Sequence, residues 1–219
     1  MAVTIDVKAD ILGKNDAVAE ELRNLFKEKH VFVLDLMGSP GCGKTTLLEK
    51  TMQALKDDIN MAVIEGDLFT SKDADRIDRY GVPVVQINTA GGCHLDAPMI
   101  KKAIENIDLD KLDLLVIENV GNLVCPAEFD IGEQKRAVVL SITEGDDKPM
   151  KYPLMFKLAS IVLLNKTDIL KFCNFNLDGA TEDIKTLNPG VEVLPVSCSL
   201  GDGLKPWLDW LREMVRSVK

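Results

Sequence analysis

The sequence GSPGCGKT, residues 38–45, fits the phosphate-binding pattern G-x-x-x-x-G-K-[ST] at every position. An apolar run of strand length precedes it at 31–37, and a stretch with helical apolar spacing follows it at 44–56. Its three glycines allow the backbone to wrap closely round a polyphosphate with the N–H groups turned inward. The segment therefore predicts a strand, a loop and a helix that together bind a nucleoside triphosphate.

The polar groups of this loop have separate expected roles. Its backbone is expected to surround the phosphates at Gly38, Ser39, Gly41, Cys42, Gly43 and Thr46. The Lys44 ammonium can reach the outer phosphates, and the Thr45 hydroxyl can ligate magnesium. The helix N-terminus behind the loop adds a favourable dipole and is expected to acidify the Cys42 thiol mildly.

The chain has 219 residues, 46% of them hydrophobic and 28% charged, which is typical of one globular domain. We expect a single domain over 1–219, with an amphipathic helix near its start at about 11–29. No apolar run approaches the roughly 18 residues that span a bilayer, and no signal peptide is recognisable. We therefore expect a cytoplasmic protein with no membrane partner. The net charge of −9 argues against nucleic-acid binding.

Strand-like and helix-like segments alternate along the chain. Strands are predicted at 31–37, 61–65, 82–87, 113–118, 136–143, 159–165 and 191–196. Helices are predicted at 16–29, 44–56, 71–80, 97–106, 176–187 and 204–217. This alternation implies an α/β fold of three layers, in which helices cover a mostly parallel sheet of about seven strands. Ligands of such sheets bind beyond the carboxyl ends of the strands.

Two carboxylates at predicted strand ends are candidate magnesium groups. Glu118 ends the run 113–118, and its carboxylate can hold a magnesium-bound water while the Gly121 N–H senses the terminal phosphate. Asp67 follows the strand at 61–65 and offers a second carboxylate. For each acid the alternative is a solvated carboxylate at a strand end or turn.

The residues NKTD at 165–168, after a predicted strand, indicate which base is bound. The Asp168 carboxylate can accept hydrogen bonds from the ring N–H and the exocyclic amine of guanine, a donor pair that adenine lacks. Asn165 and Lys166 complete the N-K-x-D pattern, and Ser197 with Cys198 resembles the short base-contacting loop of GTPases. The bound nucleotide is therefore predicted to be GTP.

Three soft ligands lie on two loops at the same sheet edge. Cys93 and His94 follow the strand at 82–87, and Cys125 follows the strand at 113–118. Thiolates and imidazole suit zinc, nickel or copper(I) rather than magnesium. A closed tetrahedral site needs a fourth ligand, which a symmetric dimer would supply. On spacing alone the alternative stays open, in which the cysteines are small buried residues and the histidine is an ordinary loop residue.

Together these segments resemble the HypB family, nickel-insertion GTPases of NiFe-hydrogenase maturation. The resemblance rests on GSPGCGKTTLLE at 38–49, Cys-His-Leu at 93–95, ENVGNLVCP at 118–126 with DIGE at 130–133, and NKTDIL at 165–170. It covers nearly the whole chain from about residue 16. Some members also carry an N-terminal cysteine cluster or a His-rich segment. The first cysteine here is Cys42, so no such nickel store is expected.

The resemblance implies the dimerising class of phosphate-loop GTPases, in which GTP promotes a homodimer. It implies a regulatory metal site of Cys93, His94 and Cys125 that holds nickel or zinc. It also implies two partners, a nickel chaperone of the HypA type and the hydrogenase large subunit or its maturation complex.

The expected function is a slow GTP-hydrolysing switch. Lys44 neutralises the phosphates, while Thr45, Glu118 and Asp67 place magnesium. The loops at 67–75, 88–97 and 119–133 would respond to the terminal phosphate and move the metal-binding cysteines.

Three alternatives are weighed against this function. A urease-maturation GTPase would place histidine after Cys-Pro, where this chain has Ala127. A small-molecule kinase is disfavoured by the N-K-x-D pattern. A protein-interaction module with a degenerate site would bind no nucleotide.

Overall fold

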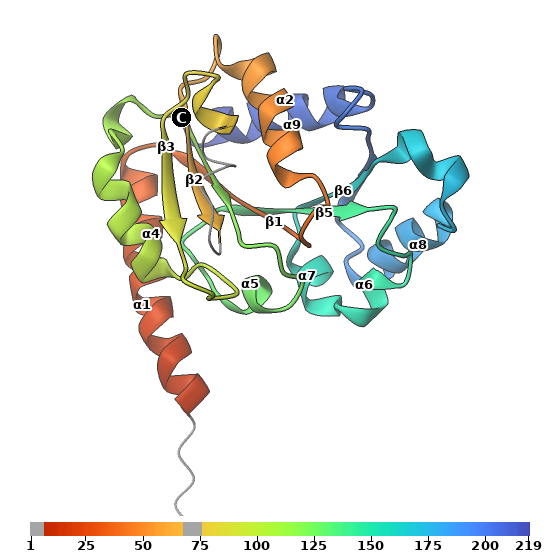
Figure 1. Cartoon of the computed structure of the whole chain (residues 1–219). Helices are drawn as coiled ribbons and strands as arrows, with labels where there is room; N and C mark the ends of the chain where they lie inside the picture. Colours follow the sequence, from red (N-terminus) through yellow and green to blue (C-terminus); the bar gives the residue numbers. More distant parts are fainter. Residues whose placement is uncertain (1–6, 68–75) are drawn as a thin grey trace, which may run out of the picture.

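The computed structural model describes residues 7–67 and 76–219, with side chains from residue 12 on. Seven parallel strands form one sheet in the order β3-β2-β4-β1-β5-β6-β7 (Figure 1). They are β1 (Phe32–Gly38), β2 (Met61–Asp67), β3 (Val84–Asn88), β4 (Leu114–Glu118), β5 (Lys135–Ser141), β6 (Ile161–Asn165) and β7 (Glu192–Pro195). The predicted α/β fold is confirmed, and each predicted strand is present.

Helices connect the strands. The longer ones are α1 (Val7–Glu28), α2 (Lys44–Leu55), α4 (Ala97–Ala103), α8 (Leu177–Leu187) and α9 (Leu204–Ser217). Five short ones were not predicted: α5 (Cys125–Glu128), α6 (Lys148–Lys151), α7 (Pro153–Leu158) and the 3-10 turns η2 (Leu109–Lys111) and η3 (Thr167–Phe172). The predicted helix at 97–106 ends in a 3-10 turn, η1 (Ile104–Asn106). The one at 71–80 lies largely outside the described residues, and 76–78 are helical.

The side chains of β1 alternate between the two faces of the sheet and so define three layers. Leu34 and Leu36 pack into the apolar core under α2 and α9, where Trp207 is fully buried. Val33 points to the other face, into the core under α1 and α4. Met37 lies on that face too, in a core shared with α7 and α8. Figure 1 shows α2 and α9 on one side of the sheet and α5 and α7 on the other.

The strand order brings the phosphate loop and one metal-binding loop together. β1 lies between β4 and β5, so the segment 119–134 that joins them must pass the carboxyl end of β1. At that crossing the Asn122 N–H donates to the Gly38 carbonyl at 3.1 Å. The topology therefore places any ligand on this segment beside the phosphate loop.

Among the described helices, none has the length and apolar character needed to cross a bilayer. The organisation of 1–219 as a single domain stays a prediction.

Candidate nucleotide and metal sites

The phosphate loop holds backbone conformations that require glycine at two positions. Gly43 begins α2 with φ 106°, and a Cβ there would lie 2.3 Å from the Asn165 Nδ2. Gly38 has φ 152°, and its Cβ would lie 2.4 Å from the Val139 carbonyl oxygen. Both positions combine a left-handed or strained backbone with a steric clash. A side chain at either would push the loop away from β5 and β6.

A cavity of about 470 Å³ opens above this loop, at the carboxyl ends of β1, β2 and β4. Several of the predicted residues line it: Gly41, Gly43, Lys44, Thr45, Thr46, Asp67, Glu118, Gly121 and Lys166. The other predicted residues are not among those that line it, namely Gly38, Ser39, Cys42, Asn165, Asp168, Ser197 and Cys198. Six further lining residues have no assigned role in the sequence prediction: Pro40, Glu65, Gly66, Arg76, Asn119 and Val120. The volume and the polar lining suit a phosphorylated ligand.

Thr45 and Glu118 meet in this cavity. The Thr45 hydroxyl donates to the Glu118 Oε1 at 2.9 Å, and both side chains are buried. Glu65 is the register partner of Glu118 across β2 and β4, so a second carboxylate lies beside the first. A hydroxyl and carboxylates of this kind are the oxygen ligands that magnesium takes beside phosphates. The residues present therefore fit a magnesium ion, and Asp67 lies in the same cavity.

Asn165 joins the base-side loops to the phosphate loop. Its Nδ2 donates to the Cys42 carbonyl at 2.8 Å, and its Oδ1 accepts from the Cys198 N–H at 3.0 Å. The Lys166 Nζ donates to the Gly41 carbonyl at 2.7 Å. Within the base-side loops, the Ser197 hydroxyl donates to the Asp168 Oδ1 at 2.6 Å. The structure thus brings the three predicted nucleotide segments into one continuous hydrogen-bonded unit.

Two thiols of this unit, those of Cys42 and Cys198, are buried. Burial raises the pKa of the Cys42 thiol to about 11. The expected acidification by the helix N-terminus is therefore wrong, because the side chain points into the core and loses its hydration. Burial also raises the pKa of Cys198 to about 12. Both residues serve through their backbone groups, since Cys42 offers a carbonyl and Cys198 an N–H to Asn165.

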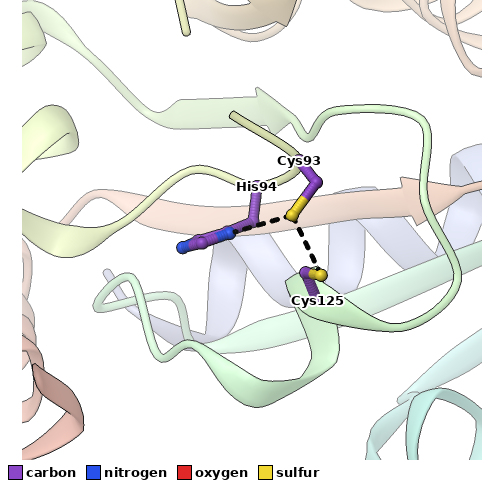
Figure 2. A group of neighbouring side chains, drawn as sticks. All are labelled: Cys93, His94 and Cys125. Carbon is purple, nitrogen blue, oxygen red and sulfur yellow. Dashed lines mark hydrogen bonds between the residues drawn. The ribbon is translucent and has the colours of Figure 1, made fainter. Parts of the chain in front are cut away.

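The three predicted soft ligands form one cluster (Figure 2). The Cys93 Sγ lies 3.0 Å from the Cys125 Sγ and 3.6 Å from the His94 Nδ1. All three ligand atoms lie within 4.8 Å of one another. Cys93 is exposed and the other two are half-buried, so the cluster is open to solvent on one side. This donor set fits a soft or borderline metal ion such as nickel or zinc.

The surroundings of the cluster shift the pKa values of two of its ligands in opposite directions. The His94 ring stacks on Phe129, with the ring centroids 3.8 Å apart. Partial burial lowers the pKa of His94, so the imidazole stays neutral and can donate a lone pair to a metal. The hydrogen bond that the Cys125 thiol shares with Cys93 raises the pKa of Cys125. A bound cation would displace that proton, because a coordinating thiol is deprotonated.

Asn122 links the metal cluster to the phosphate loop. Besides the bond from its N–H to Gly38, its side-chain Nδ2 donates to the Cys93 carbonyl at 3.4 Å. Gly121, beside it, lies so close to Pro40 that a Cβ would approach within 2.9 Å. One short segment therefore touches the phosphate loop, the Cys93 loop and, three residues on, carries Cys125.

The sequence prediction gave no role to Asn119, Asn122, Phe129 or Arg76. The two asparagines lie within the ENVGNLVCP run, on either side of Gly121. Their position close to this glycine was the sequence signal that could have identified them. Arg76 reaches the cavity from outside the predicted motifs, and its guanidinium hydrogen-bonds Glu49 on α2. The stacking of Phe129 on His94 depends on tertiary structure and had no local signal.

Comparison with known proteins supports this arrangement. Residues 32–195 match the model of the CobW/HypB/UreG nucleotide-binding domain family. The hydrogenase maturation factor HypB of Escherichia coli (strain K12) is 49% identical over 207 residues, covering 94% of this chain and 71% of that protein. A probable hydrogenase maturation factor HypB from Methanocaldococcus jannaschii is 41% identical and covers 98% and 97%.

Solved structures show the same relationship. HypB from Helicobacter pylori, in complex with nickel, superposes with a TM-score of 0.88 at 40% identity over 93% of this chain and 96% of that one. HypB from Archaeoglobus fulgidus gives the same TM-score at 35% identity, over 93% and 100%. Because the family match spans most of the chain and these relatives align along nearly all of it, the chain belongs to the CobW/HypB/UreG family, among the HypB hydrogenase maturation factors.

Proposed function

We propose that this maturation factor is a GTP-hydrolysing switch that binds nickel and releases it according to its nucleotide state. One observation carries the proposal. The segment after β4 bonds to Gly38 of the phosphate loop, bonds to the Cys93 carbonyl and carries Cys125. A displacement of this segment by the terminal phosphate would change the distance between the two thiols.

For the nucleotide we propose GTP with magnesium. Asp168, held by Ser197, accepts the two guanine donors, and Lys44 stabilises charge that develops on the terminal phosphate. Thr45 and Glu118, with Asp67, would hold magnesium, which neutralises phosphate charge when it is bound. Unassisted hydrolysis at about 10⁻³–10⁻⁴ s⁻¹ is expected. A competition assay in which ATP displaced labelled GTP as well as GTP itself does would contradict guanine selection and favour a kinase.

For the metal we propose nickel as the delivered ion, since the Helicobacter pylori relative is described in complex with nickel. Zinc suits the same ligands. One chain supplies three ligands, and a second copy in a GTP-promoted homodimer would complete the coordination. A nickel chaperone of the HypA type and the hydrogenase large subunit are the proposed partners. A reducing cytoplasm would keep both thiols available.

A second delivery target has one observation in its favour. A relative from Helicobacter hepaticus, 44% identical over 198 residues, is described as a hydrogenase/urease maturation factor HypB. Nickel transfer from the loaded protein to a urease apoprotein, without transfer to a hydrogenase large subunit, would favour this target.

Nickel titration tests the metal proposal. Parent protein is compared with a variant carrying Cys93→Ala and Cys125→Ala, and with Cys173→Ala as the control. Cys173 is a free, half-buried thiol outside the cluster. We expect the double variant to lose nickel binding by more than about tenfold, since coordination depends on the thiolates, while its GTP affinity measured without nickel is unchanged. Equal nickel affinity in the parent and the double variant would contradict the proposed site.

A further inference from the structure

A buried polar group lies beneath both metal-binding loops. It consists of Asp35 on β1, Asn119 after β4, Glu133 before β5 and Arg136 on β5, and we call it the polar brace. Asp35 and Asn119 are 0% and 1% exposed, and the side chains of Glu133 and Arg136 are 6% and 12% exposed. The nucleotide chemistry proposed above uses neither Glu133 nor Arg136.

Arg136 holds the backbone that carries the metal ligands. Its guanidinium pairs with Glu133 and uses its two remaining nitrogens on carbonyls of the Cys125 segment. Nη1 donates to the Ala127 carbonyl at 3.2 Å and Nη2 to the Phe129 carbonyl at 3.0 Å. These residues lie in and directly after α5, which begins at Cys125, and the Phe129 ring stacks on His94. One side chain therefore positions two of the three ligands, Cys125 through the backbone of α5 and His94 through the ring of Phe129.

Asn119 holds the opposite loop in the same way. Its Oδ1 accepts a hydrogen bond at 3.2 Å from the N–H of Leu95, the residue directly after His94. Its Nδ2 donates to the Asp35 Oδ1 at 3.1 Å. Asp35 and Arg136 are register partners on the neighbouring strands β1 and β5, which closes the brace between the two loops. The Cys93–His94 loop and the Cys125 loop are thus held against one common buried centre.

Stability alone is a poor reason for these charges. Removing an ion pair from water costs as much as its attraction returns, so apolar residues of similar volume would stabilise the fold equally well. In contrast, α5 has only four residues and cannot fix its own orientation. A planar guanidinium that donates to two carbonyls and one carboxylate supplies that orientation, and the ammonium group of lysine cannot make the same set of directed hydrogen bonds.

We propose that Arg136 is a positioning residue for the Cys93, His94 and Cys125 cluster. It sets the geometry and affinity of metal binding without touching the metal. The inference rests on the proposed metal-binding function. Partners that orient metal ligands in this way typically contribute about 10–100-fold to metal affinity.

The test compares Arg136→Met and Arg136→Lys with the parent. Arg23→Met is the matched control, because Arg23 pairs with Asp130 in the same segment but contacts neither Ala127 nor Phe129 in the described structure. Nickel affinity is measured by competition with a chromophoric chelator, together with the thiolate-to-nickel absorption band and GTP affinity. A double variant, Glu133→Gln with Arg136→Met, leaves no unpaired Glu133 charge and serves if the single variant fails to fold.

We expect Arg136→Met and the double variant to lose about 10–100-fold in nickel affinity and to shift the absorption band. Arg136→Lys should recover only part of the loss, and Arg23→Met should match the parent in nickel affinity. The GTP affinities of all variants, measured without nickel, should equal that of the parent. Unchanged nickel affinity and an unchanged band in the Arg136 variants, with a parent that binds nickel, would overturn this inference alone. A parent that binds no nickel would overturn the proposed metal site and this inference with it.

Discussion

At the residue scale, single side chains with several partners explain how distant motifs become one site. Asn165 bonds to both Cys42 and Cys198, so the loop that contains Cys198 cannot shift without moving the phosphate loop. Asn122 links Gly38 and Cys93 in a similar way, the first through its backbone N–H and the second through its side-chain amide. These hydrogen bonds make the relative positions of the phosphate, base and metal groups depend on two residues, Asn165 and Asn122.

Asp35 makes stability depend on pH. Burial raises the pKa of its carboxyl from 3.8 to about 8, and its Oδ2 has no hydrogen-bond partner among the described residues. The folded state therefore holds this proton more tightly than the unfolded state. The stabilisation is fully present below about pH 4 and is lost as the pH rises towards 8.

We expect Asp35→Asn to remove this dependence, because an amide keeps the acceptor for Asn119 and carries no charge. Between pH 5 and 8 the parent should lose up to about 1.4 kcal/mol per pH unit in free energy of unfolding relative to the variant. Denaturant unfolding of the metal-free protein at several pH values measures the difference. Any packing cost of the substitution shifts both ends equally, so parallel pH curves for the two proteins would refute the assignment.

At the element scale, the strands and long helices could be predicted and the short helices could not. Five of the strands, β1, β2, β4, β5 and β6, are mainly buried runs with a strong local pattern, while the edge strands β3 and β7 are partly exposed. The helices α2 and α9 have clear apolar stripes. α5, α6 and α7 have four to six residues each, too few to show a helical period. Prolines in their first turns, such as Pro126 and Pro149, mark helix starts, which was the one available signal.

The candidate site divides in the same way. Motifs with fixed spacing, such as 38–45 and 165–168, were enough to predict the nucleotide-binding loops that contain them. The grouping of Cys93, His94 and Cys125 followed from the parallel sheet, because all strand carboxyl ends meet at one edge. The polar brace was not predicted, since Asp35 and Arg136 lie on different strands and come together only through the β1–β5 pairing and the folded loop.

At the scale of the whole molecule, the exposed side of the metal cluster predicts association. The three ligands found among the described residues of one chain leave coordination incomplete, and a symmetric partner would bring a second set. With nickel and a nonhydrolysable GTP analogue, we expect sedimentation velocity to give twice the monomer mass, and with GDP mainly the monomer. A monomer in both states at micromolar concentration would rule out the proposed GTP-promoted dimer.

Nucleotide and metal affinities must also be linked if the switch exists. The linkage runs through the segment 119–128, which contacts the phosphate loop and carries Cys125. Linkage of this kind is reciprocal and typically amounts to about 5–150-fold in affinity.

The most direct test is therefore the nickel dissociation constant of the same protein loaded with a nonhydrolysable GTP analogue and then with GDP. The switch predicts nickel binding that is about 5–150-fold tighter in the GTP-like state, and no such difference when Cys93 and Cys125 are alanine. Equal nickel dissociation constants in the two nucleotide states of the parent protein would contradict it.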